Sequence, residues 1–80
     1  MTREYTELTG DHKAVTQTAV ALAEAGRTVT VRRGNSTTEL PADIGSIQHN
    51  DGRSYVFVNG VVRATVREDS TVMVSEVIDQ

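Results

Sequence analysis

The chain has 80 residues, of which 38% are hydrophobic and 24% charged, with a formal net charge of −3 and no cysteine. A chain of this length forms one domain with a thin core, and the lack of cysteine excludes disulfides, thiolate catalysis and cysteine-based metal sites. No apolar run approaches the roughly 18 residues needed to span a bilayer, and the first residues are polar, so we expect a cytoplasmic protein without a membrane partner.

Residues 1–10 show no hydrophobic period, and we expect a loosely ordered N-terminal segment there. Asp11 has the side chain of a helix N-cap, and the residues after it are mostly good helix formers. The predicted helix covers 11–26 and ends at Gly26, which suits a left-handed C-terminal position. One apolar stripe predicts the side of this helix that packs on a sheet: Val15, Ala19, Leu22 and Ala23.

Residues 27–78 alternate between β-branched and polar residues and are interrupted by short turns, one of them over residues 49–52. Turns this short join antiparallel neighbours. We therefore predict an α+β fold, with one N-terminal helix packed on an antiparallel meander of five to six short strands. Curling of this sheet towards a small barrel is an alternative form of the same fold. The predicted strands cover 27–33, 36–40, 44–48, 53–58, 61–67 and 71–77.

Two β-branched runs joined by Asn59-Gly60 predict a β-hairpin with a type I′ turn, because both central residues of such a turn need positive φ. A regular two-residue hairpin pairs Val58 with Val61 and alternates side chains between its two faces. The predicted core face then carries Tyr55, Phe57, Val62, Ala64 and Val66. The opposite face carries an apolar patch of Val56, Val58 and Val61 at the hairpin tip.

This apolar patch has two interpretations. In the first, the patch is covered, either by curling of the sheet or by the loop that follows Pro41. In the second, the patch is a protein interface, since exposed apolar clusters mark binding sites. The second interpretation, or pairing through a free sheet edge, predicts a homo-oligomer. Val56, Val58 and Val61 are the predicted interface residues.

A second candidate surface consists of arginines on the predicted strands. The central residues 27–67 carry six Arg and three carboxylates. Guanidinium groups that share one face suit phosphate or a carboxylate-rich partner, although outward Arg also keeps sheets soluble. The predicted anion or nucleic-acid contacts are Arg32, Arg33, Arg63 and Arg67. A helix followed by several strands resembles the element order of small nucleic-acid-binding barrels of the Sm type. The resemblance is limited to this order, because no sequence motif of that family is present.

No residue pattern indicates catalysis. His12 falls in the first helical turn, where we expect it to be solvated, and His49 falls in a predicted turn. The sequence has no second ligand cluster for a metal, no nucleophile elbow and no phosphate-binding glycine loop. We therefore expect no catalytic residue, metal or cofactor, and no small-molecule substrate is evident.

These observations predict a small non-catalytic interaction module, of an accessory or viral type, that self-associates through a sheet edge or the apolar hairpin face. The alternative is a nucleic-acid-binding small β-barrel that uses the arginine-bearing strands, which a net charge of −3 does not favour.

Overall fold

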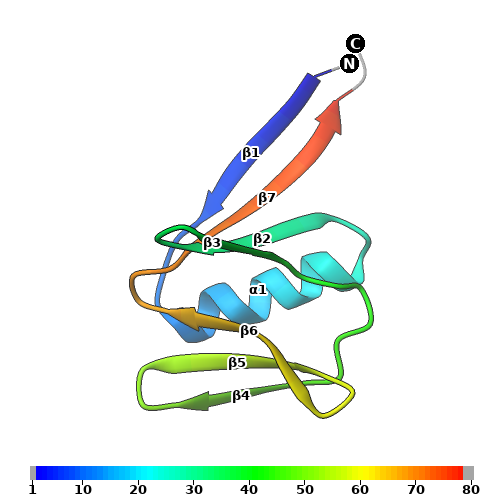
Figure 1. Ribbon diagram of the computed structural model, residues 1–80. Helices are drawn as coiled ribbons and strands as arrows, with labels where there is room; N and C mark the ends of the chain where they lie inside the picture. Colours follow the sequence, from blue (N-terminus) through cyan, green and yellow to red (C-terminus); the bar gives the residue numbers. More distant parts are fainter. Residues whose placement is uncertain (1, 79–80) are drawn as a thin grey trace.

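The structure, a computed structural model, describes residues 2–78 and confirms the α+β class (Figure 1). Within these residues the chain forms one helix and seven strands, more than the five to six predicted. In chain order the elements are β1 (Thr2–Leu8), α1 (His12–Glu24), β2 (Thr28–Arg33), β3 (Ser36–Glu39), β4 (Ser46–Asn50), β5 (Arg53–Val58), β6 (Val61–Arg67) and β7 (Thr71–Ile78).

The strands are arranged in two antiparallel sheets instead of one meander. The first sheet has the order β1-β7-β2-β3 and the second has the order β4-β5-β6. The helix α1 packs against strands of both sheets. No hydrogen-bonded pairing joins the two sheets within residues 2–78, so the described chain does not form a closed barrel.

Where the sequence predicts a loosely ordered segment over residues 1–10, the structure has the strand β1 over Thr2–Leu8. It pairs with β7 along its whole length, from Thr2↔Ile78 to Leu8↔Val72, and β7 lies between β1 and β2. All side chains of β1 except Leu8 are exposed, so its order comes from the backbone ladder to β7 and from a hydrogen bond of 2.8 Å that Arg3 Nη1 donates to Ser75 Oγ of β7. Within residues 2–78 a strand therefore precedes α1, and the helix-first order that resembled the Sm-type barrels is absent there.

The helix begins as predicted. Asp11 is the N-cap, and its carboxylate accepts a hydrogen bond of 2.9 Å from the Ala14 amide. That bond lowers the pKa of the Asp11 carboxyl below its ordinary value of 3.8. The buried side of α1 includes Val20, whereas Leu22 from the predicted stripe is only half-buried.

Both hairpin turns of the second sheet place two successive residues at positive φ. Asn59 and Gly60 have φ angles of 54° and 77°, which confirms the predicted turn. Asp51 and Gly52 have φ angles of 51° and 73° and join β4 to β5 in the same way. His49, predicted to lie in that turn, belongs to β4.

A β-bulge between β5 and β6 changes the register predicted for the second hairpin. Phe57 pairs with Val62 as expected, but Val56 then pairs with Ala64, which leaves Arg63 without a partner in the ladder. Every pair beyond the bulge is shifted by one residue from the prediction: Val56↔Ala64, Tyr55↔Thr65, Ser54↔Val66 and Arg53↔Arg67.

This shift overturns part of the predicted faces of the hairpin: Ala64 and Val66 are buried in the core as predicted, but the residues of β5 exchange faces. Val56 has no exposed surface and packs in the core, so it cannot be part of an apolar surface patch. Val58 is half-buried, and Val61 at the turn is 66% exposed. Tyr55 and Phe57, predicted to lie in the core, project from the opposite side of the sheet, because side chains alternate along a strand.

The core consists almost entirely of small aliphatic side chains from α1 and both sheets. These small residues let α1 lie close to the strands, while each one buries little apolar area. The buried hydrophobic residues are Val15, Ala19, Val20, Ala23, Val29, Val31, Leu40, Val56, Ala64, Val66, Val72 and Val74.

Replacing Val56 by Ala should lower the free energy of unfolding by about 2 kcal/mol, because two buried methyl groups are lost and a cavity remains. The matched variant Val61→Ala removes the same atoms from an exposed side chain. It should change the free energy of unfolding by less than about 0.5 kcal/mol. Urea denaturation measures both variants. Equal effects would contradict the bulged register.

Asp11→Asn should flatten the pH dependence of stability in acid, because Asn caps a helix as well as Asp but does not titrate. The folded-state pKa of Asp11 lies below 3.8, so its stabilising contribution is complete above that value and is lost as the pH falls through the folded-state pKa. Thermal unfolding followed by circular dichroism should show a steeper fall of Tm on acidification for the wild type. Parallel curves for the two proteins would contradict this role.

Candidate functional site

The second sheet has one face on the core and one face with no element packed on it within the described residues. Antiparallel partners share a face, so the observed register defines this outer surface, here called the open face. The open face consists of Ser46, Gln48 and Asn50 of β4, Arg53, Tyr55 and Phe57 of β5, and Val62, Thr65 and Arg67 of β6.

The chemistry of the open face differs from that of the rest of the chain. None of its nine positions is acidic, although the chain carries 11 Asp and Glu. Tyr55 and Phe57 stand two residues apart on the central strand and are half-buried, and Val62 beside them is 45% exposed. The surface therefore combines aromatic rings, arginine and neutral hydrogen-bonding groups.

The four arginines predicted as anion contacts lie on two different sheets. Arg32 and Arg33 lie on β2 in the first sheet, whereas Arg63 and Arg67 lie on β6 in the second. Arg33 donates through Nε to both carboxylate oxygens of Asp69 at 3.0 Å, and this bond lowers the pKa of the Asp69 carboxyl. The register places Arg67 directly opposite Arg53.

On the other side of the same sheet, both histidines of the chain meet at one buried hydroxyl. The Nδ1 atoms of His12 and His49 lie 2.9 Å and 2.7 Å from Ser54 Oγ, and the ring centroids are 6.3 Å apart. Ser54 Oγ also lies 3.3 Å from the His12 carbonyl oxygen, to which it donates. A hydroxyl can donate one hydrogen bond and accept two, so these three contacts use its full capacity.

This cluster joins three elements. His12 comes from the first turn of α1, His49 from β4 and Ser54 from β5. The expectation that His12 is solvated is wrong, because its ring is half-buried against Ser54. The Ser54 side chain has no exposed surface, so no substrate reaches its Oγ in this conformation. The cluster therefore fastens the start of the helix to the second sheet.

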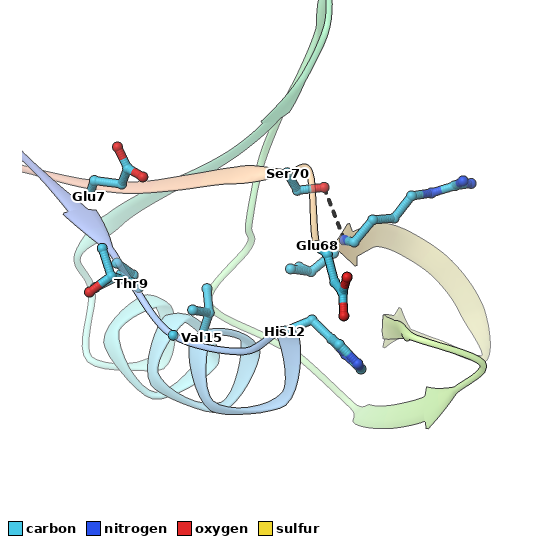
Figure 2. A pocket seen from close by; sticks show the side chains of 10 residues that line it. Glu7, Thr9, His12, Val15, Glu68 and Ser70 are labelled. Atoms are coloured by element: carbon cyan, nitrogen blue, oxygen red, sulfur yellow. Dashed lines mark hydrogen bonds between the residues drawn. The ribbon is translucent and has the colours of Figure 1, made fainter.

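A pocket of about 180 Å³ lies beside this cluster, between the start of α1 and the turn from β6 to β7 (Figure 2). Figure 2 shows the Glu68 side chain directed towards His12, while Glu7 lies on the other side of the pocket and points away. Ser70 at the rim accepts a hydrogen bond of 3.0 Å from the Arg67 amide. Within residues 2–78, no three His, Asp or Glu side chains are placed to hold a metal ion.

The third candidate is the free edge of β1. Only one side of this strand is paired within the described residues, and Figure 1 shows β1 and β7 extending away from the part of the molecule that α1 covers. The β2 ladder on β7 ends at Ser75, so the outer part of β7 pairs with β1 alone. Tyr5 near the middle of β1 is 62% exposed. A two-stranded ribbon of this kind is only marginally stable on its own.

Comparisons of the chain with known protein families, with curated proteins and with solved structures found no match. No helix among the described residues is long and apolar enough to cross a lipid bilayer. A function is therefore inferred from the chemistry of the open face, of the pocket beside the histidine cluster and of the free edge of β1.

Ser54→Ala should lower the free energy of unfolding by about 1–3 kcal/mol, because both histidine Nδ1 atoms lose their partner in a half-buried environment. The control is Ser46→Ala, which changes an exposed serine on the open face of the same sheet and should be close to neutral. Chemical denaturation gives the stabilities, and the imidazole NMR signals of both histidines should move together in Ser54→Ala. Unmoved signals would contradict the shared contact.

Proposed function

We propose that the protein is a small, non-catalytic, cytoplasmic interaction module that forms a homodimer through the free edge of β1. The observation that carries this proposal is an exposed seven-residue edge whose side chains complement a second copy of themselves. Unpaired edge strands are ready templates for pairing with another chain, and a two-fold axis makes such an interface self-complementary.

The complementarity follows from antiparallel pairing of β1 with the partner's β1 around Tyr5. In that register Arg3 lies opposite the partner's Glu7, and symmetry creates the same ion pair twice. Tyr5 lies opposite the partner's Tyr5 on the same face, because residues 3, 5 and 7 alternate to one side. Opposite-charge and aromatic cross-strand pairs each contribute roughly 0.2–1 kcal/mol.

Neighbouring registers are less favourable. A shift by two residues in one direction places Glu4 opposite the partner's Glu4, and a shift in the other direction places Tyr5 opposite the partner's Glu7. Like charges directly opposite each other destabilise a sheet. The register centred on Tyr5 uses all seven residues of β1 and is the one that brings both ion pairs together.

The same edge also supports the choice of a second copy as the partner. Pairing would continue the first sheet across the two-fold axis and would give the outer part of the β1–β7 ribbon a neighbour on its open side. The hairpin tip is a weaker candidate, because Val56 is in the core and only Val61 is widely exposed. An interface role for Val58 and Val61 stays a prediction.

Sedimentation equilibrium should show a concentration-dependent monomer–dimer equilibrium for the wild type. Arg3→Glu and Glu7→Arg should each weaken the dimer about tenfold or more, because each turns two attractive pairs into two repulsive ones. The double variant Arg3→Glu/Glu7→Arg restores opposite charges at both places and should recover dimerisation.

Arg32→Glu is the matched control, since Arg32 is an exposed arginine of the same sheet that lies on an inner strand. It should leave the dimer unchanged. A wild type that stays monomeric at the highest soluble concentration would refute the proposal. Failure of the double variant to recover dimerisation, with all variants folded by circular dichroism, would refute the register.

A further inference from the structure

The open face of the second sheet presents a charge arrangement that the fold itself does not need. Arg53 and Arg67 are direct cross-strand partners, so their side chains leave the same face of the sheet side by side. Like charges in this position destabilise a sheet, and neither arginine forms an ion pair with another described residue. An anion bound between the two guanidinium groups would remove this repulsion and accept their hydrogen bonds.

The aromatic residues next to these arginines are placed for stacking. Tyr55 and Phe57 belong to the central strand and point away from α1, and neither is part of the hydrophobic core. Two residues along a strand span about 7 Å, so the two rings stand in a row that starts beside Arg53. Single-stranded nucleic acids are bound in this way by other open sheets, with bases on aromatic rings and the backbone near basic side chains.

We infer that the open face binds single-stranded nucleic acid. Bases stack on Tyr55 and Phe57, and Arg53 and Arg67 hold backbone phosphates at one end of the row. Gln48 and Asn50 of β4 lie directly opposite Tyr55 and Arg53, where their side-chain amides can bond to base edges. The site lies on the second sheet and is separate from the β1 edge of the first, so it does not depend on dimerisation.

The charge distribution of the chain favours a single strand over a duplex. With a net charge of −3, the protein as a whole repels a polyanion, and attraction comes from the open face, whose nine strand positions include two arginines and no carboxylate, although Asp69 interacts electrostatically with Arg67. A duplex keeps its bases stacked on one another and offers mainly phosphates to such a face. A single strand offers both phosphates and free base surfaces, and so it uses the arginines and the aromatic rings together.

Fluorescence anisotropy with labelled oligothymidylate of about a dozen nucleotides, within the roughly 4–16 nucleotides that single-strand binding folds cover, tests the inference at low salt. Phe57→Ala should weaken binding about tenfold and leave its salt dependence unchanged, because stacking releases no counterions. Arg53→Gln should weaken binding and reduce the slope of log affinity against log salt by about 0.7. Phe57→Leu removes the aromatic ring but keeps an apolar side chain of similar size, so it should stay folded. It should also bind the oligonucleotide weakly.

Arg32→Gln is the matched control, since it removes an exposed arginine from the other sheet and should leave binding unchanged. A duplex of equal length should bind more weakly than the single strand, and inorganic polyphosphate should compete poorly. Absence of binding at low salt would overturn the inference. Equal competition by polyphosphate, or full binding by Phe57→Leu and Phe57→Ala, would overturn it in favour of a site for negative charge alone.

Discussion

One extra residue in β6 determines which side of the second sheet meets the helix. In a regular hairpin Arg53 would lie opposite Val66, so an arginine would share the face that enters the core. The bulge at Arg63 moves Ser54 to that position and places Arg53 opposite Arg67 on the outside. It also turns Val56 inward and the two aromatic rings outward. Small side chains then face the alanine-rich side of α1, where rings would hold the helix away from the sheet.

The two surfaces proposed for binding are exposed because this short chain has too few elements to cover both sheets. One short helix packs against both sheets, and no second layer lies on the outer face of β4-β5-β6 among residues 2–78. The ribbon of β1 and β7 likewise extends past the helix (Figure 1). In a domain of this size, strands beyond the reach of the helix keep an edge or a face in solvent. Such surfaces carry side chains chosen for solubility or for a partner, and the fold alone explains neither the charge pattern of β1 nor the paired arginines.

Local signals in the sequence predict much of this fold, and non-local pairings account for the rest. The Asp11 cap, the Asn59-Gly60 turn and most strands depend on neighbouring residues, and the structure confirms them. Strand β1 has no apolar alternation, and its partner lies at the far end of the chain, so no local pattern indicates it. A clue to the bulge was available, since the regular register would turn Arg53 towards the core. The alternation of Ile47 and His49 on β4 could likewise have placed His49 on the inner face with Ser54.

The two proposed surfaces also divide the charge of the protein in a consistent way. Along β1, Arg3 is accompanied by two carboxylates, Glu4 and Glu7, so this edge has a net negative charge and offers no net attraction to a polyanion. The open face carries arginine without carboxylates, while the acidic residues lie elsewhere on the chain. Because the remainder of the protein repels phosphate, charge alone gives weak binding at physiological salt. In the proposed complex, base stacking on Tyr55 and Phe57 would therefore supply most of the affinity, and the arginines would determine where the backbone lies.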